Sequence, residues 1–143
     1  MLFQEVGARP ARLWAVGDPL PASACRVRLE AAIPETLEAG TIHEFECLVA
    51  NCGDAILVSA PPNPVHISYR WVNRREDGDV IEGDRSILPE ALPPGVERIC
   101  RFSLRTPQAP GDYRLIVTLV QEQVAWFDEL DPRNAWSGQV HIV

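Results

Sequence analysis

Hydrophobic and polar residues alternate along several short segments of the chain, and this pattern predicts β-strands. In residues 25–31, the sequence Cys-Arg-Val-Arg-Leu-Glu-Ala places every second side chain on one face. No segment keeps a 3.6-residue period, so we expect helix only as a turn within 83–92 or 128–136. The expected strands are 25–31, 41–50, 65–72, 80–82, 96–105, 112–122 and 138–143.

Turn residues separate these segments. The chain has 13 prolines and 9 glycines, and many of them lie between the expected strands. Asp-Gly at the centre of Glu76-Asp-Gly-Asp79 is typical of a β-hairpin turn. Short strands with this punctuation predict an all-β fold, an immunoglobulin-like antiparallel β-sandwich of seven to nine strands.

Two aromatic residues agree with this fold. Gly111-Asp-Tyr113 enters a long expected strand and resembles a tyrosine corner, in which the hydroxyl binds backbone a few residues upstream. Trp71 shares a strand face with Ile67 and Tyr69, so we expect it in the core.

The length of 143 residues suits a single domain. Pro10, Pro19 and Pro21 interrupt the first part of the chain, so we expect residues 1–24 to be a lead-in and residues 25–143 to form the sandwich. Trp14 is expected to dock on the domain.

The charge and the apolar runs exclude some partners. A net charge of −7 without a basic run argues against nucleic acid. The chain has no apolar stretch of about 20 residues, so no membrane insertion is expected. The first residues lack a basic stretch followed by an apolar one, and we therefore expect a cytoplasmic protein.

The chain has four cysteines, Cys25, Cys47, Cys52 and Cys100. Their spacing matches no common zinc motif, and structural disulfides are rare in a reducing compartment. Cys47 and Cys100 fall on apolar strand faces. We expect four reduced thiols, with disulfides and metal binding as alternatives.

The sequence contains no catalytic motif. Its three histidines, His43, His66 and His141, lie on three different expected strands. The acidic run Asp128-Glu-Leu-Asp131 could supply calcium ligands, but it lacks the spacing of an EF-hand loop and is interpreted as a solvated loop. We expect a non-enzyme without cofactor or metal, although a spatial triad of Ser or Cys with His and Asp stays open as a minor alternative.

Aromatic residues near the end of the chain are candidates for ligand binding. Trp126 and Phe127 point to opposite sides of an extended chain, and Trp136 lies in an expected loop near Arg133 and Asn134. An exposed tryptophan among such polar groups is typical of a sugar-binding surface. These five residues form the candidate site, with the alternative that the rings close one end of the sandwich.

Several segments together resemble a known family. These segments are Val49-Ala-Asn-Cys-Gly-Asp54, Ile67-Ser-Tyr-Arg-Trp71, Leu92-Pro-Pro-Gly95, Thr106-Pro-Gln-Ala-Pro-Gly-Asp-Tyr-Arg-Leu115 and Leu119-Val-Gln-Glu-Gln-Val-Ala-Trp-Phe127. With them the chain resembles, over roughly residues 25–143, the accessory immunoglobulin-like domains of bacterial surface-polysaccharide proteins, which include glycosyltransferases, sugar methyltransferases and the ATPase subunit of O-antigen ABC exporters.

The resemblance implies a non-catalytic role in binding a polysaccharide glycan or its assembly intermediate, beside a glycosyltransferase or exporter domain. The resemblance does not identify any particular binding residue in this sequence. The alternative function is a protein–protein adaptor, because Ile116 and Val120 lie opposite the inward residues of their strand and could form an apolar outer patch. A homodimer stays open alongside a monomer.

Overall fold

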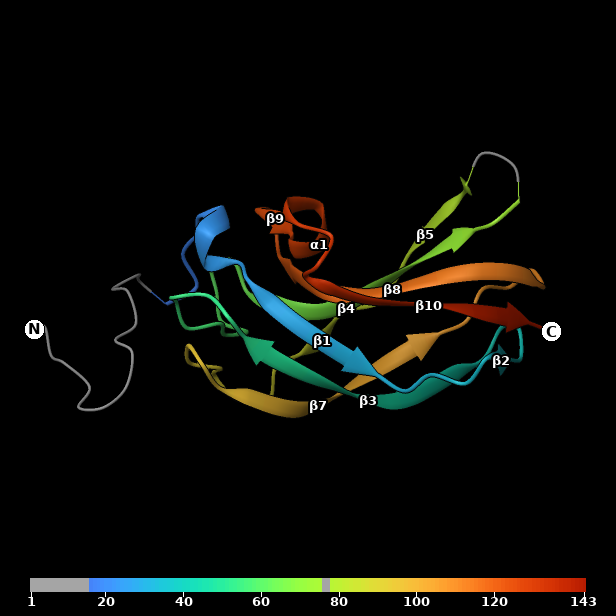
Figure 1. Cartoon of the computed structure of the whole chain (residues 1–143), viewed down its shortest axis with the longest axis horizontal. Coiled ribbons are helices and arrows are strands. Elements are labelled where there is room, and N and C mark those ends of the chain that lie inside the picture. Colours follow the sequence, from blue (N-terminus) through green and yellow to red (C-terminus); the bar gives the residue numbers. More distant parts are fainter. Residues whose placement is uncertain (1–15, 76–77) are drawn as a thin grey trace, which may run out of the picture.

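The computed structural model describes residues 16–75 and 78–143, which form an all-β sandwich of two sheets (Figure 1). One sheet has the strand order β1-β3-β7, and the other has the order β2-β10-β8-β4-β5, with β6 beside β4 and β9 beside β8. The elements are η1 (Ala22–Ala24), β1 (Val27–Ala31), β2 (Thr36–Leu37), β3 (Ile42–Asn51), β4 (Val65–Asn73), β5 (Val80–Glu82), β6 (Ser86–Ile87), β7 (Glu97–Arg105), β8 (Gly111–Gln121), β9 (Ala125–Trp126), α1 (Phe127–Leu130) and β10 (Ala135–Ile142).

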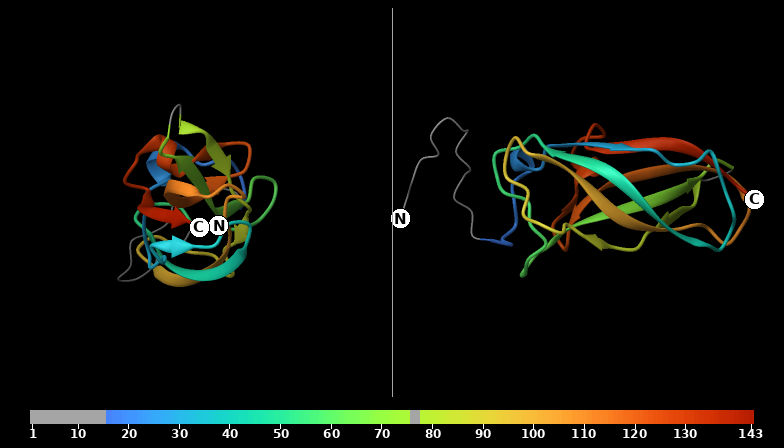
Figure 2. Two further views of the ribbon diagram at one scale, coloured as in Figure 1. Left: turned by 90° about the vertical axis from the view of Figure 1, so that its right-hand side faces the viewer. Right: turned by 90° about the horizontal axis from the view of Figure 1, so that it is seen from below.

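The two sheets lie face to face as two layers, which the end-on view makes clear (Figure 2). All the strand pairs within them are antiparallel except β2 with β10. The chain changes sheets between β1 and β2, because β1 pairs with β3 whereas β2 pairs with β10. The seven expected strands are all present, and the predicted all-β sandwich is confirmed.

Three differences from the expected elements bear on the site. The last strand begins at Ala135 rather than at residue 138, so Trp136 lies in a strand and the expectation of a loop there is wrong. The two-residue strands β2, β6 and β9 were not expected from the sequence. Helix α1 starts one residue before the segment in which a helical turn was expected. Residues 16–75 and 78–143 contain no helix that is long and apolar enough to cross a membrane.

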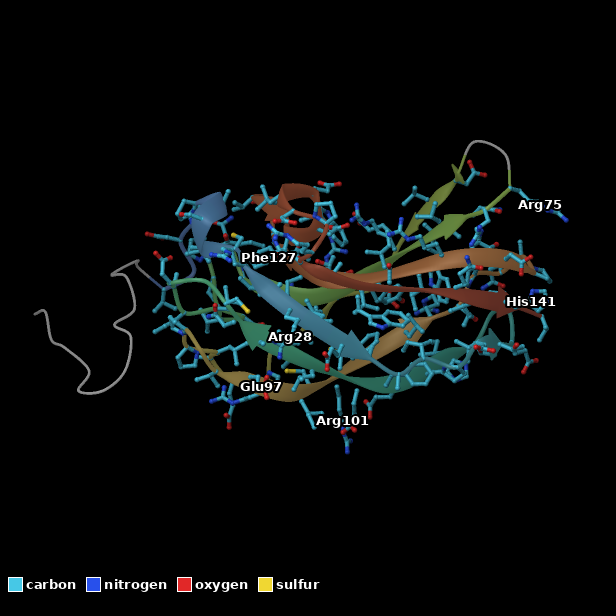
Figure 3. All side chains as sticks on the ribbon, viewed as in Figure 1. Arg28, Arg75, Glu97, Arg101, Phe127 and His141 are labelled. Atoms are coloured by element: carbon cyan, nitrogen blue, oxygen red, sulfur yellow. The ribbon has the colours of Figure 1, made fainter. Side chains whose placement is uncertain are left out.

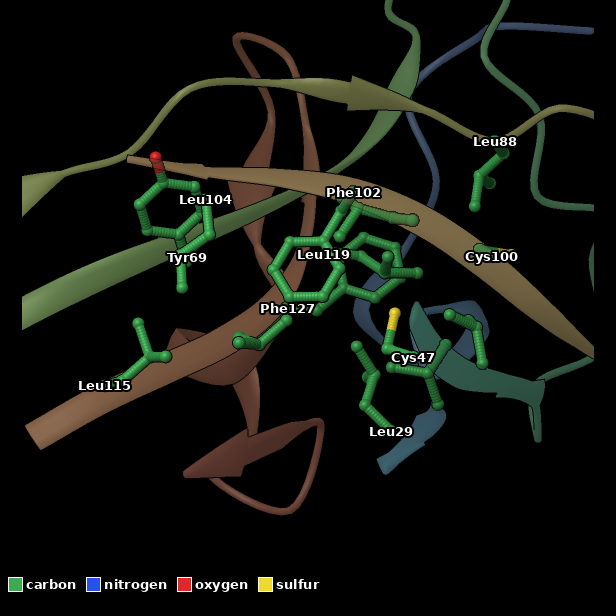
Figure 4. Packing of buried hydrophobic residues seen from close by; sticks show 14 of the residues in the cluster. Leu29, Cys47, Tyr69, Leu88, Cys100, Phe102, Leu104, Leu115, Leu119 and Phe127 are labelled. Carbon is green, nitrogen blue, oxygen red and sulfur yellow. The ribbon is translucent and has the colours of Figure 1, made fainter. Parts of the chain in front are cut away.

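The core between the sheets is built from the inward residues of the long strands (Figure 4). Trp71 is fully buried, as the alternation predicted, and its indole N–H donates to the Arg105 carbonyl at 3.0 Å. The Tyr113 hydroxyl donates to the Ala109 carbonyl at 2.8 Å, which confirms the tyrosine corner. The Trp71 and Tyr113 rings meet edge to face with centroids 5.9 Å apart.

Two backbone N–H groups on the open edge of β7 form hydrogen bonds with side chains from the opposite sheet. The Arg105 N–H donates to the Tyr69 hydroxyl at 2.7 Å, and the Ser103 N–H donates to the Ser86 hydroxyl at 3.0 Å. An open strand edge presents backbone groups to which another chain can pair. These cross-sheet bonds therefore protect β7 and tie the two sheets together.

The four cysteines are free thiols, in agreement with the expectation of reduced cysteines. Cys25, Cys47 and Cys100 are buried, whereas Cys52 is exposed. Burial raises the pKa of Cys25 to about 11 and, with a smaller contribution from Cys100, that of Cys47 to about 12. These two thiols are therefore protonated and unreactive at neutral pH.

Part of the expected lead-in packs on the sandwich, at the end of the molecule opposite to the C-terminus (Figure 1). The buried Gln121 side chain accepts a hydrogen bond from the Leu20 N–H at 2.9 Å and donates to the Asp18 carbonyl at 2.8 Å. Ala24 is fully buried. Trp14, which was expected to dock here, lies outside the described residues.

Candidate functional site

A connection between β8 and β10 places Trp126 on the outer face of the larger sheet. The chain turns at the end of β8, returns as β9 and then forms α1 before it enters β10. Trp126 pairs with Val120 of β8, and paired residues on neighbouring strands project from the same face. Val120 in turn pairs with His66 of β4. Trp126 is half-buried and covers Val120, whose side chain is only 3% exposed.

Two arginines lie over the Trp126 ring. The guanidinium carbon of Arg70, from β4, is 4.6 Å from the ring centre, and that of Arg85, from the segment before β6, is 4.9 Å away. Guanidinium groups at this distance are attracted to the π-electrons of an indole. These contacts hold the ring against the outer face of the sheet.

Carboxylates pair with the same arginines. Arg70 forms ion pairs with Asp128 and, at 2.9 Å, with Glu129, both from α1. Arg85 Nε lies 2.8 Å from a carboxylate oxygen of Glu122, the first residue after β8. His66 Nδ1 lies 2.7 Å from that same oxygen.

Burial and pairing shift the pKa values of two of these acids in opposite directions. Partial burial would raise the pKa of Glu122, but hydrogen bonds from His66 and Arg85 outweigh it and lower the pKa below its ordinary value. Burial raises the pKa of Asp128, and the opposing effect of Arg70 does not cancel that rise.

An open hollow of about 250 Å³ adjoins Trp126. Polar side chains line it, including Arg85, Glu122, Gln123 and Glu129. Gln123 has a φ of 65°, a left-handed conformation that is uncommon outside glycine, at the turn between β8 and β9. An aromatic ring beside amide, carboxylate and guanidinium groups can bind a polar ligand that also has apolar faces.

Trp126 is the one predicted residue that lines this hollow. Phe127 and Asn134 are buried, and Arg133 and Trp136 lie elsewhere. Phe127 is fully buried and packs in the core near Leu119 and Phe102 (Figure 4), so its predicted role in ligand binding is wrong. Phe127 follows β9 and begins α1, and the chain turns its side chain inward at this point (labelled in Figure 3).

Asn134 is also a structural residue. Its Oδ1 accepts a hydrogen bond from the Val27 N–H at 3.1 Å, and its amide donates to the carbonyls of Cys25 and Phe127. The side chain is buried and its polar atoms are engaged within the chain. Asn134 therefore joins β1, α1 and the start of β10 instead of contacting a ligand.

Trp136 and Arg133 lie apart from Trp126. Trp136 pairs with the buried Val117, so its ring points inward, where it is partly buried against the core. The ring lies over Gly138, at which a Cβ atom would come within 2.7 Å of it. Arg133 is 87% exposed, pairs with Asp131 at 2.8 Å and lines a separate hollow of about 200 Å³.

Four residues of the Trp126 surface were missed from the sequence. Arg70, Arg85, Glu122 and His66 come from segments up to 56 positions apart and meet only across strands. The alternation shows that Arg70 and His66 face outward, but it does not show which strands are neighbours. Pairing between β4, β8 and β9 was the missing information.

Two of the three histidines each lie against one acid, His66 against Glu122 and His141 against Asp112. Ser68 is on the same strand face as His66, but it is fully buried and its hydroxyl donates to the Asp84 carbonyl at 2.9 Å. Residues 16–75 and 78–143 contain no group of three or more histidine, cysteine, aspartate or glutamate residues that could hold a metal ion. In the acidic run, Asp128 pairs with Arg70 and Asp131 with Arg133.

Known protein families and curated proteins give no match to the chain. Solved structures share its fold. The CARDB domain of a Pyrococcus furiosus protein, determined by solution NMR, superposes with a TM-score of 0.50 at 20% identity, over 82% of this chain and 94% of that domain. A D270A mutant of a Listeria innocua β-glucosidase, in complex with laminaribiose, gives a TM-score of 0.52 at 15% identity over 82% of this chain.

The chain spans only 16% of that β-glucosidase, whereas it spans nearly the whole CARDB domain. At these low identities the likeness establishes the fold alone. The chain thus has an immunoglobulin-like fold.

Proposed function

We propose that this protein is a non-catalytic carbohydrate-binding domain that recognises a bacterial surface polysaccharide or its assembly intermediate. The observation that supports the proposal most is the half-buried Trp126 beside an open hollow lined by polar side chains. Sugar rings stack their C–H faces on an indole while amide and charged groups bind their hydroxyls. Gln123, Glu122 and Glu129, which line the hollow, would supply those polar contacts.

The sequence resemblance favours the same role. Accessory sandwich domains of glycosyltransferases and O-antigen exporters act on polysaccharides, and a comparable role would place this chain in polysaccharide assembly or export on the cytoplasmic side. The Ser68 hydroxyl donates to a backbone carbonyl, and Asp128 and Glu122 are paired with arginines. Because these groups are engaged within the protein, they support a binding role over a catalytic one.

Titration calorimetry with surface polysaccharides of the source bacterium tests the proposal. We expect wild-type protein to bind at least one of them, and Trp126→Ala to lose at least about 1 kcal/mol of binding free energy, which is roughly fivefold in affinity. Arg133→Ala is a matched control because Arg133 is exposed and lies in a different hollow. Folded protein that binds none of these glycans would refute the proposal, and equal losses in both variants would move the site away from Trp126.

A protein–protein adaptor is the second candidate, but the exposed apolar residues lie elsewhere than the sequence predicted. Val120 is covered by Trp126 and Ile116 is only half-exposed, so the expected apolar patch on β8 is not formed. The β4–β5 hairpin projects from the body of the sandwich and exposes Val80 and Ile81 instead (Figure 1). This hairpin, rather than β8, is the surface on which an adaptor role would depend.

A further inference from the structure

The charged groups around Trp126 have an excess of negative charge. The guanidinium groups of Arg70 and Arg85 are the cations of this ion-paired cluster. The carboxylates paired with them are Glu82, Glu122, Asp128 and Glu129. Two positive and four negative side chains leave a formal charge of −2 with His66 neutral and −1 with His66 protonated, so the cluster is negative in both cases. A ligand at this surface therefore meets a negative field.

The guanidinium donors of Arg85 are engaged within the protein. Its Nε donates to Glu122, and its Nη1 donates to the Gly83 carbonyl at 3.0 Å. Its Nη2 faces Glu82 at 3.5 Å. The recognition of a ligand carboxylate by arginine usually needs two parallel free N–H groups. Arg85 does not present such a pair.

Arg70 is engaged in the same way. Its two terminal nitrogens donate to Glu129 and Asp128. Its remaining nitrogen, Nε, is buried, as is Asp128 Oδ1, and neither has a hydrogen-bond partner within the described part of the chain. Binding a carboxylate here would require Arg70 to release α1.

Two of the carboxylates are open to solvent. The side chains of Glu129 and Glu82 are 61% and 59% exposed, and Glu129 lines the hollow. A positively charged ligand group would therefore be stabilised at this surface, whereas a negatively charged group would be repelled.

We propose that the Trp126 hollow selects uncharged and amino sugars over acidic sugars, and that it binds a protonated amino sugar more tightly than the N-acetylated form of the same sugar. This inference depends on the proposed carbohydrate-binding function and specifies its ligand class. The ammonium group of the sugar lies toward Glu129, and the sugar ring stacks on Trp126.

Three oligosaccharides of equal length test this selectivity with the full chain: a glucosamine oligomer, an N-acetylglucosamine oligomer and a galacturonic acid oligomer. Calorimetry at slightly acidic pH is expected to show that the glucosamine oligomer binds about two- to fivefold more tightly than the N-acetylated one, as for one solvent-exposed ion pair. The galacturonic acid oligomer is expected to bind most weakly. Added salt should reduce the advantage of the amine, because salt screens exposed charges.

Glu129→Gln removes the exposed carboxylate and should bring the affinity ratio of the amine to the N-acetyl form close to one. Glu90→Gln is the matched control, because Glu90 is 70% exposed and pairs with Arg98 instead of this cluster. Equal or tighter binding of the galacturonic acid oligomer would overturn the selectivity while leaving carbohydrate binding intact. An unchanged ratio in Glu129→Gln would overturn it as well. If the protein binds none of the three sugars or the polysaccharides above, the proposed function fails and this inference fails with it.

Discussion

The side chain of a tryptophan on this sandwich takes its role from the strand face on which it lies. Trp71 lies on the inner face of β4, fully buried between the sheets and hydrogen-bonded to the Arg105 carbonyl. Trp126 lies on the outer face, half-buried under two guanidinium groups. Trp136 points inward from β10 but stays partly exposed at the margin of the core.

Replacing Trp71 by alanine should strongly destabilise the fold. Removing a fully buried aromatic side chain typically costs about 3–5 kcal/mol, because the lost contacts are not regained when the cavity relaxes. The free energy of unfolding of a domain is about 5–15 kcal/mol, so Trp71→Ala would come close to unfolding the protein. Urea denaturation followed by far-UV circular dichroism measures the difference.

Trp126→Ala provides the comparison for that measurement. Its ring is already partly in water, so we expect a smaller loss, below about 3 kcal/mol, than at a core position. A loss at Trp126 that equals the loss at Trp71 would contradict the assignment of Trp126 to the surface.

Period-two alternation was sufficient to predict Trp71, Tyr69 and the inward residues of β8, because a long strand fixes the direction of each side chain. It also held for the neighbours Trp126 and Phe127, which point outward and into the core, but it did not tell which of the two would be buried. The face of a two-residue strand such as β9 depends on the strand with which it pairs, and the sequence does not show this pairing. The same difficulty hid the inward direction of Trp136, whose strand begins three residues earlier than expected.

A few polar side chains hold the connection from β9 through α1 to β10 in place, because its helix is too short to be stable by itself. Helix α1 has only four residues and no side-chain cap at its start. The Thr118 hydroxyl donates to the Asn134 carbonyl at 2.6 Å, and Asn134 itself bonds to β1 and to Phe127. Arg70 clamps the helix from outside through Asp128 and Glu129.

Asn134→Ala should therefore weaken this connection together with β1. The substitution leaves the Val27 N–H and the Cys25 carbonyl without the partner that Asn134 provides, whereas the Phe127 carbonyl still accepts from the Asp131 N–H. Each buried group left unsatisfied costs about 1–3 kcal/mol. We expect a loss of at least about 2 kcal/mol in the free energy of unfolding and faster amide exchange in residues 127–131.

Asn73→Ala is the matched control for that experiment. Asn73 accepts one local hydrogen bond from the Arg75 N–H at an exposed turn, so its loss should be below about 1 kcal/mol. A small, equal effect at both asparagines would show that Asn134 does not hold the connection.

At the scale of the whole molecule, the sequence pattern was enough to predict the sandwich, since strand length, the turn residues between strands and the tyrosine corner all indicate the same fold. The outer-face cluster was beyond prediction, because it depends on which strands are neighbours. The extent of the domain was also hard to judge. Prolines suggested a lead-in that ends at residue 24, yet residues from Gly17 onward bond to the body through Asn63 and Gln121.

These contacts predict that the folded domain includes residues 17–24 and does not begin at Cys25. A chain that starts at residue 25 loses the partners of the Gln121 amide at Leu20 and Asp18, together with the buried Ala24. We expect it to be less stable than a chain that starts at residue 16 by about 1–3 kcal/mol, measured by urea denaturation. Gln121→Ala should destabilise the longer chain more than the shorter one, because in the shorter chain two of the hydrogen bonds of this side chain are already gone and only the one to the Asn63 carbonyl remains. Equal stability of the two chains would instead support a domain that begins at Cys25.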